Sequence, residues 1–437
     1  MTASLPLAID PADPVFLSYR HSDGTRITGR LAWLLRAAGV PVWRDVDDLP
    51  PGDTIARLQQ AIDDGISGAV IVVTPEIENS KIVREIEAPR LLDLHTAHPE
   101  FTLGIVNAAK RGSATPDYTE PDQLLRLTPG TLSGVDQQPA SRAGLHQLVD
   151  GLLGARIAHL RSAIAAADHT LELSIQTRNT PQVYDRTGGQ LDLRLRPAKD
   201  ERLPSRVGLA DLAEVIGLLP DAVVRSGATG VVIRGGGHLS VALALGAALP
   251  STRVGRIRVI DQSGEAWASG SEPVFADPPN VQVASQGSCA GAGDRTAVAV
   301  FVDMLPTRSD AAFERFLDEH GIDLAAWLHL TSVSTALLDP DQAGRIAADL
   351  AAHLRQLSAA HSNAEIHLLL RCPFPLAVLV GRLTNTLQFV AYEWNNSQEP
   401  GSGDRRPQYL PCMRIEASSG AGVIQQVLLP SGRRSRR

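Results

Sequence analysis

Residues 68–87 read GAVIVVTPEIENSKIVREIE, and this stretch decides how the first part of the chain folds. Its apolar run, residues 69–73, has the length and β-branched content of a buried strand, and Thr74-Pro75 ends that strand. In the segment that follows, Ile82 and Ile86 lie four residues apart, as on one face of a helix. The stretch therefore predicts a buried strand that leads into a helix.

Four glutamates crowd this segment, and their spacing alone does not rank them. Ser80 is a good N-cap, and the helix that it begins places Glu85 and Glu87 on opposite flanks of an apolar stripe. Glu76 and Glu78 precede that helix. Solvated acidic turns are common on protein surfaces, so the spacing leaves both a structural and a functional role open.

Short apolar runs alternate with helical patterns on both sides of this segment. The expected strands lie at residues 15–20, 40–43, 69–73 and 101–106. Such alternation predicts a parallel sheet with right-handed crossovers, in which ligands bind beyond the carboxyl ends of the strands. Three polar segments are expected at that edge, at residues 18–20, 43–47 and 74–87.

Composition indicates an ordinary globular protein with more than one domain. The chain has 437 residues, of which 43% are hydrophobic and 20% charged. Its net charge of −7 argues against binding to long nucleic acids through the whole surface. The three cysteines are widely spaced and form no CxxC pair, so neither a disulfide framework nor a metal site is expected. No signal-peptide pattern and no apolar run long enough to span a membrane is seen, so we expect a cytoplasmic protein.

Three motifs in the first quarter of the chain resemble the Toll/interleukin-1 receptor (TIR) domain. They are VFLSYRHSD at residues 15–23, VWRDVDDLPPGD at residues 42–53 and the opening stretch at residues 68–87. Their order and spacing match the first strand, the BB loop, and the third strand with its following helix in that family. The resemblance implies a flavodoxin-like domain with a parallel sheet.

Catalytically active TIR domains cleave NAD+ to nicotinamide and ADP-ribose with a glutamate on the helix after the third strand. The resemblance implies that this residue is Glu85. Many such domains have an aromatic residue four positions earlier, where this chain has Lys81, so Glu87 remains an alternative. Nicotinamide leaves NAD+ as a neutral molecule, so a single carboxylate that stabilises the oxocarbenium-like ribose is sufficient. NAD+ is then the substrate, and no cofactor is implied.

The same resemblance implies a set of NAD-binding residues around the glutamate. They are Ser18, Tyr19, Arg20, Trp43, Asp45 and Asp47. A tryptophan can stack on a planar ring, an arginine can pair with a phosphate, and aspartates can bond ribose hydroxyls. Trp43 is equally well explained as a hydrophobic strand end and Arg20 as part of a surface ion pair. A non-catalytic TIR adaptor would instead use the rigid loop at residues 49–52 for self-association.

A helical connector separates this region from the rest of the chain. Residues 141–167 carry apolar side chains at steps of three and four, and Gly151 and Gly154 weaken the helical pattern. We therefore predict one domain at residues 1–155 and a second at residues 156–437.

The second domain contains an approximate internal repeat. The order strand, arginine, small turn, helix, glycine, strand occurs around residues 231–260 and again around residues 366–394. A repeat of this kind predicts two similar α/β halves whose converging strand ends form one pocket. Residues 235–238 read GGGH, and such a turn before a helix suits a phosphate but is also an ordinary flexible turn.

The repeated blocks resemble a SAVED domain, the sensor module of antiviral cyclic-oligonucleotide systems. They read IRGGGHLSVALALGAAL at residues 233–249, and LLLRCPFPLAVLVGRL at residues 368–383 followed by FVAYEW. SAVED domains are fused pairs of CARF-like Rossmannoid halves, here at about residues 165–285 and 295–430. They bind cyclic di-, tri- or tetranucleotides.

By position, the resemblance implies that residues of both halves line the nucleotide pocket. They are Arg234, Gly235, Gly236, His238, Arg371, Pro373, Phe374 and Trp394. Arginines there would neutralise phosphates, and Phe374 or Trp394 would stack on bases. Both aromatic residues are equally compatible with a place in the core.

Together the two resemblances imply an abortive-infection effector of a CBASS antiphage system. A cyclic oligonucleotide, which we expect to be cyclic tri-adenylate, drives self-association into a homo-oligomer or filament and so activates NAD+ cleavage. A ligand-gated scaffold without catalysis, which recruits a separate effector, is the alternative. A third reading is a C-terminal domain that degrades its ligand through His238, His361 or His367, but no paired catalytic arrangement is visible in the sequence.

Overall fold

The computed structural model divides the chain into two compact units. The residues that it describes are 9–43, 54–109, 117–178, 188–198, 202–270, 279–288, 296–396, 407–420 and 422–430. The first unit comprises Met1–Ser174, Thr180–Arg194 and Asp221–Ala228, and the second comprises Ile175–Asn179, Leu195–Pro220 and Thr229–Arg437. Within the described ranges, no helix combines the length and the apolar character that crossing a membrane requires.

The first unit is built on a five-stranded sheet with the order β2-β1-β3-β4-β5. Its strands are β1 (Val15–Tyr19), β2 (Val42–Trp43), β3 (Gly68–Val73), β4 (Thr102–Asn107) and β5 (Asp136–Pro139). Every pairing in it is parallel, as the alternation of strands and helices predicts. The short polar strand β5 is absent from the sequence prediction because DQQP carries no apolar pattern.

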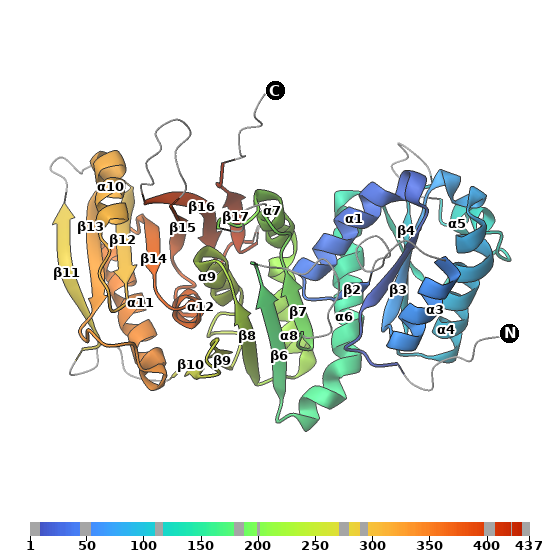
Figure 1. The fold of residues 1–437 in the computed structure, drawn as a ribbon, viewed down its shortest axis with the longest axis horizontal. Coiled ribbons are helices and arrows are strands. Elements are labelled where there is room, and N and C mark those ends of the chain that lie inside the picture. Colours follow the sequence, from blue (N-terminus) through green and yellow to red (C-terminus); the bar gives the residue numbers. More distant parts are fainter. Residues whose placement is uncertain are drawn as a thin grey trace. The chain divides into compact units, whose positions relative to one another are not determined.

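Helices cover both faces of this sheet. In Figure 1, α1 (His21–Ala37) and α6 (Arg142–Ala166) lie on one side, and α3 (Thr54–Asp64) and α4 (Ala88–Ala97) lie on the other. A further short helix, α5 (Glu120–Leu124), precedes β5. The core on the α4 side includes Phe16, Ile71 and Leu91, all almost fully buried. Because all the strands pair in parallel, their carboxyl ends lie at one edge of the sheet.

The segment after β3 does not form the single regular helix that its sequence predicts. A 3₁₀ turn, η1 (Pro75–Asn79), is followed by a π-helical turn, η2 (Val83–Glu87), which runs into α4. A π turn adds a residue to the helical repeat, so side chains after it are rotated relative to an ideal α-helix. Ile82 is 37% exposed, whereas Ile86 is partly buried and packs against the core.

Helix α6 is continuous from Arg142 to Ala166, with the Ser141 hydroxyl accepting from the Gly144 amide at its start. The glycines at 151 and 154 therefore do not interrupt it. The predicted domain boundary at residue 155 falls within this helix and remains a prediction.

The remaining strands form two more sheets. The first has the order β10-β9-β8-β6-β7, and the second has the order β11-β13-β12-β14-β15-β16-β17. The bounds are β6 (Thr170–Gln176), β7 (Leu191–Arg194), β8 (Gly230–Gly236), β9 (Arg256–Ile260), β10 (Ala266–Ala268), β11 (Val281–Ser288), β12 (Ala297–Asp303), β13 (Ala326–Ser332), β14 (Glu365–Arg371), β15 (Gln388–Asn395), β16 (Gln408–Glu416) and β17 (Ile424–Val427). The helices are α7 (Arg206–Val215), α8 (Leu219–Ser226), α9 (Leu239–Ala248), α10 (Ala311–His320), α11 (Ala343–Ala360) and α12 (Phe374–Leu383).

The predicted repeat corresponds to two strand–helix–strand units in the second compact unit. In β8–α9–β9 and in β14–α12–β15 the two strands of each unit pair in parallel. Helices α9 and α12 pack against each other through reciprocal glycines. A Cβ atom on Gly246 would lie 2.0 Å from the Val378 carbonyl oxygen, and one on Gly381 would lie 2.2 Å from that of Leu243. Only glycine permits this approach of two helix backbones, so the halves are joined at their helices.

Candidate functional site

The carboxyl edge of the first sheet brings the end of β1 next to the π turn η2. Ser18, on β1, is buried, and its hydroxyl donates to the Glu87 carboxylate across 2.5 Å. Glu87 itself is only 6% exposed. Glu87 therefore anchors η2, the turn that also carries Glu85, to the end of β1.

Glu85 takes the opposite orientation on the same turn. Its side chain is 60% exposed, and the buried Arg84 guanidinium lies 3.8 Å from its carboxylate. An ion pair at this distance and exposure is weak. The Glu85 carboxylate is thus accessible to a substrate from solvent, whereas that of Glu87 is enclosed.

The predicted NAD-binding residues occupy different environments. Trp43 is 7% exposed and stacks on Phe16, with ring centroids 5.1 Å apart. Tyr19 is buried and stacks on His21 at 4.9 Å. The hydroxyl of Ser18 is engaged by Glu87. Asp45 and Asp47 lie outside the described residues. All six assignments remain predictions, and Trp43 would need to leave its stacked position to contact a ligand.

Arg20 belongs to a polar network at the same edge. Its guanidinium pairs with the Glu76 carboxylate at 2.9 Å. The Ser22 hydroxyl donates to the same carboxylate, and Asp23 accepts from the Thr74 hydroxyl at 2.9 Å. Sequence reasoning missed this link, although Glu76 directly follows the Thr74-Pro75 strand end. The network ties the first turn of α1 to η1.

In the second unit, the GGGH turn connects β8 to α9. Gly235 has φ +110°, and a Cβ there would lie 2.2 Å from the Ile175 carbonyl oxygen, so the position requires glycine. Arg234 is exposed, whereas His238 is fully buried, with its Nδ1 2.8 Å from the Thr177 hydroxyl. Arg234 is therefore accessible to a ligand, and His238 supports the turn from inside.

The first turn of α9 receives a carboxylate from the other half of the repeat. Glu393, on β15, is 4% exposed and accepts a hydrogen bond from the Ser240 amide at 2.7 Å. Burial raises the pKa of Glu393, although its hydrogen bonds with Ser240 act in the opposite direction. The sequence shows only an acid between two aromatic residues, so this cap was missed. The contact places β15, which carries Trp394, beside the first turn of α9.

Three of the remaining predicted pocket residues lie around the start of α12. The Arg371 guanidinium, at the end of β14, pairs with the buried Asp303 carboxylate at 2.5 Å. Pro373 is the N-cap residue of α12, and Phe374 begins the helix with its side chain half-buried. Trp394 is 47% exposed, so it is not a core residue. An exposed tryptophan and an arginine near strand ends match the requirements for a nucleotide.

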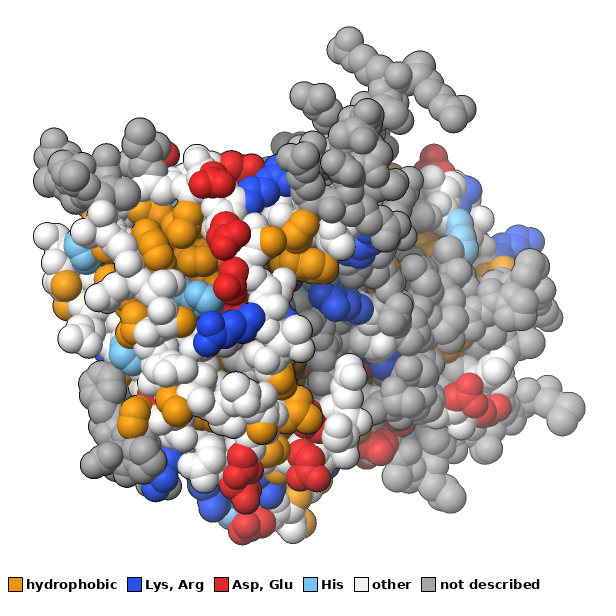
Figure 2. Space-filling model, turned by 60° about the vertical axis from the view of Figure 1, so that its left-hand side comes forward, with side chains coloured by type: hydrophobic (Ala, Val, Ile, Leu, Met, Phe, Trp, Pro, Cys, Tyr) orange, Lys and Arg blue, Asp and Glu red, His pale blue; other side chains and the backbone are white. Residues whose placement is uncertain are grey.

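Figure 2 shows one face of the molecule, with the side that carries β11 and α10 in Figure 1 brought forward. Hydrophobic side chains gather in several patches there, with acidic, basic and histidine side chains between them. Exposed large hydrophobic residues of this unit include Val283, Val333 and Leu337, the last of which is 80% exposed. Such patches are typical of surfaces that contact other macromolecules.

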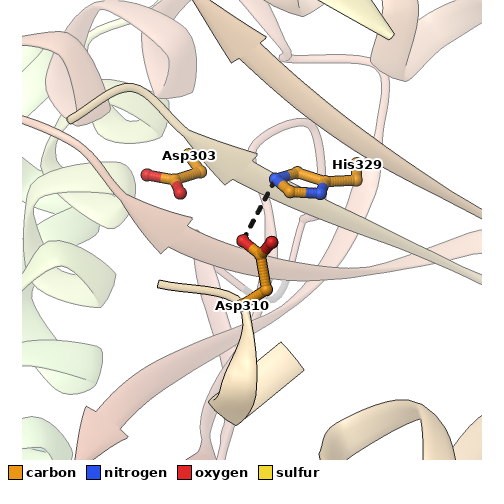
Figure 3. Close-up of side chains that lie close together, drawn as sticks. All are labelled: Asp303, Asp310 and His329. Carbon is orange, nitrogen blue, oxygen red and sulfur yellow. Dashed lines mark ion pairs between the residues drawn. The ribbon is translucent and has the colours of Figure 1, made fainter. Parts of the chain in front are cut away.

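Close to Arg371 lies a cluster of titratable groups that the sequence did not reveal. Asp303, Asp310 and His329 have ligand atoms that all lie within 4.8 Å of one another (Figure 3). Desolvation lowers the pKa of His329, against the opposing influence of the two aspartates. The cluster could not be read from the sequence because its members lie on three separate elements.

Family models match both parts of the chain. A TIR domain matches residues 15–107, and the SAVED family, described as "SMODS-associated and fused to various effectors sensor domain", matches residues 216–415. The chain is a TIR–SAVED fusion. Its parallel first sheet is the TIR sheet, and the paired strand–helix–strand units lie in the SAVED part.

Solved structures that resemble the TIR–SAVED chain are Cap4 SAVED/CARF-domain containing receptors. That of Acinetobacter baumannii with the cyclic trinucleotide 3'3'3'-cAAA has 14% sequence identity and a TM-score of 0.44, covering 84% of this chain and 86% of that one. That of Moraxella osloensis has 14% identity and a TM-score of 0.39, covering 81% and 83%. No curated protein matches the chain.

Proposed function

We propose that the TIR–SAVED protein is an NAD+ glycohydrolase that a cyclic oligonucleotide activates by driving self-association. The observation that carries the proposal is an exposed glutamate at the carboxyl edge of a TIR sheet, in a chain that also contains a sensor domain of a family fused to effectors. Glu85 is the proposed catalytic carboxylate. We further propose that the system acts in CBASS antiphage defence, where loss of NAD+ stops the cell.

The chemistry requires little of the protein beyond charge and position. The N-glycosidic bond of NAD+ breaks with its electron pair going to the pyridinium nitrogen, so nicotinamide departs without protonation. The Glu85 carboxylate would stabilise the positive charge that develops on the ribose, and water then adds to C1′ and loses a proton to the solvent. Its 60% exposure supports this role because a catalytic group must touch the substrate.

Glu87 is the weaker candidate for the same role. A carboxylate that is 6% exposed and accepts from Ser18 is not open to a dinucleotide in this conformation. We propose that it positions η2, and hence Glu85, against β1. Replacing Glu87 would then disturb the placement of Glu85 without removing the reacting group.

The proposed sensor pocket lies at the strand ends of the SAVED part. Arg234 is exposed, and Trp394 lies on the strand that Glu393 holds beside α9. Arg371 is paired with Asp303, so a phosphate that binds Arg371 must compete with that carboxylate. A cyclic tri-adenylate offers three phosphates and three adenine faces to such a pocket. These features support an anionic, base-bearing ligand.

Activation would follow from differential binding. A ligand shifts the protein toward assembly only by the difference between its affinities for the assembled and the free chain. The exposed hydrophobic residues on the SAVED part, such as Val333 and Leu337, offer apolar area for contacts between copies. We propose that such contacts align TIR domains and complete the NAD+ site.

The deciding experiment measures NAD+ consumption by the purified full chain with and without cyclic di-, tri- and tetranucleotides. We expect cleavage only with one class of ligand, together with a ligand-dependent increase in particle size. Ligand-dependent assembly without NAD+ loss would instead identify a non-catalytic scaffold. A fall in ligand concentration on long incubation would identify a nucleotide-degrading enzyme.

A further inference from the structure

A buried cluster of metal-ligating side chains lies at the carboxyl edge of the seven-stranded sheet, outside the proposed NAD+ site. Asp303 is the last residue of β12, His329 lies on the neighbouring parallel strand β13, and Asp310 is the residue before α10. In the strand register, Phe301 is opposite His329 and Asp303 is opposite Thr331. The two strands and the helix start therefore converge at one place.

The three side chains present unused ligand atoms to one another. Asp303 is 2% and His329 is 5% exposed. Within the part of the chain that the structure describes, Oδ2 of Asp303, Oδ1 of Asp310 and Nε2 of His329 have no hydrogen-bond partner. His329 Nε2 and Asp310 Oδ1 are 4.0 Å apart, which is too long for a hydrogen bond (Figure 3). Burying polar atoms without hydrogen-bond partners costs free energy, and a bound ligand would offset that cost.

The charges around the cluster favour a cation. Arg371 neutralises one carboxylate by donating to Oδ1 of Asp303, whereas Oδ2 of Asp303 and Oδ1 of Asp310 have no hydrogen-bond partner among the described residues. The positive charge of Arg308 lowers the pKa of His329 and therefore disfavours protonation of its imidazole. A divalent ion shared by the two carboxylates would offset the repulsion between them.

We propose that Asp303, Asp310 and His329 bind one divalent transition-metal ion, with Zn²⁺ or Mn²⁺ as the expected class. Imidazole nitrogen with carboxylate oxygen suits these ions, whereas an imidazole ligand disfavours Mg²⁺ and Ca²⁺. Ligand atoms on a tetrahedral Zn²⁺ at about 2.1 Å lie about 3.4 Å apart, so the cluster, whose ligand atoms lie within 4.8 Å of one another, must contract on binding. Asp310 can supply that movement because it precedes the helix and its side chain is 39% exposed.

The surrounding ring contacts fix the orientation of the imidazole. His329 lies 4.8 Å from the Phe301 ring and 5.8 Å from the Phe313 ring, measured between centroids. A ligand ring held in place by packing loses little freedom when it binds metal. The ion would tie the start of α10 to β12 and β13 and would hold Asp303 beside Arg371. Water would complete its coordination.

The test uses the full chain without an affinity tag, stripped with a chelator and dialysed. We expect one Zn²⁺ per chain by metal analysis after dialysis against a slight excess, a higher Tm with Zn²⁺ than with Mg²⁺, and visible absorption bands with Co²⁺ as a spectroscopic substitute. The variant Asp310→Ala removes a half-exposed ligand with little effect on packing. It should bind Zn²⁺ at least about tenfold more weakly.

Two further variants separate a metal site from a structural role. His329→Phe keeps the ring stack and removes the nitrogen ligand, so it should abolish the Co²⁺ bands while remaining folded. Asp318→Ala, at an exposed position on the same helix, is the matched control and should bind as the unaltered protein does. Zn²⁺ binding of equal strength in all four proteins, or no retained metal in any of them, would overturn the proposal.

Discussion

The Ser18 hydroxyl and the Glu87 carboxylate meet at 2.5 Å, across 69 residues of chain. This bond closes the carboxyl edge of the TIR sheet between β1 and the π turn η2. Glu87 is 6% exposed at this bond, whereas the side chain of Glu85, on the same turn, is 60% exposed. The two glutamates therefore lie in different environments, although they are only two residues apart in the sequence.

Removing the Ser18 hydroxyl should destabilise the carboxyl edge of the TIR sheet. We expect Ser18→Ala to lower the stability of the TIR domain by about 1–3 kcal/mol, because a buried carboxylate loses a charge-assisted hydrogen bond. Thermal unfolding followed by circular dichroism would show it as a lower Tm. Ser22→Ala, which removes an exposed hydroxyl bond to Glu76, is the matched control and should change the Tm little. Equal effects of the two substitutions would contradict a structural role for Ser18.

Replacement of the exposed glutamate should stop catalysis without unfolding the protein. Glu85→Gln should lower the rate of NAD+ cleavage at least about 100-fold, since an amide cannot stabilise a developing positive charge as a carboxylate does. The Tm should be unchanged because the side chain is 60% exposed. The control is Glu78→Gln, at an exposed position on η1. Cleavage that survives Glu85→Gln but not Glu87→Gln would move the catalytic role to Glu87.

The crossing of α9 and α12 should not tolerate a methyl group. Gly246→Ala and Gly381→Ala each place a Cβ within 2.2 Å of a backbone carbonyl oxygen on the other helix. We expect each to destabilise the SAVED part by about 1–3 kcal/mol, because rigid helix backbones must separate. Gly217→Ala is the control, since a Cβ there meets nothing within 4 Å. If both glycine variants had the Tm of the unaltered protein, helices α9 and α12 would pack less closely than the structure shows.

Glu393 should make the stability of the SAVED part depend on pH. Burial raises its pKa in the folded protein, so its contribution is fully present below the unfolded value of about 4.3 and is lost as the pH rises through the folded value. Glu393→Gln removes this titration but keeps an oxygen for the Ser240 amide. The Tm of the variant relative to the unaltered protein should therefore increase from about pH 4 to about pH 8. A difference that is constant over this range would contradict the prediction.

Trp394 offers a test of the proposed nucleotide pocket. The side chain is 47% exposed, so Trp394→Ala should leave the Tm nearly unchanged. It should weaken binding of the activating cyclic nucleotide by about 1–3 kcal/mol if a base stacks on the indole. Leu337→Ala, which removes a more exposed apolar side chain, is the control for nonspecific effects in a calorimetric titration. Equal affinity in both variants would remove Trp394 from the pocket.

The order of elements in the TIR part was predictable because local patterns determine it. The run at residues 69–73 is too apolar to lie anywhere but in a buried strand, and β3 spans Gly68–Val73 as expected. The repeat in the second part also emerged, because each copy carries an arginine at its strand end and a glycine within its helix. In the second part, strands β10, β11, β13, β16 and β17 were missed; β11 is polar and largely exposed, and its sequence shows no strand pattern.

The candidate sites also combine residues that the sequence motifs indicated with contacts that only the folded chain shows. The resemblances carried by the sequence motifs pointed to Glu85 or Glu87 as the candidate carboxylate and to Arg371 and Trp394 for the sensor, and these assignments stay predictions. Which glutamate faces solvent was decided by the folded chain, because Glu87 is buried at its bond to Ser18 whereas Glu85 is exposed. The Glu393 cap on α9 and the Asp303–Asp310–His329 cluster join residues from separate elements. Contacts of that kind arise only when the sheets and helices pack, so tertiary structure alone decided them.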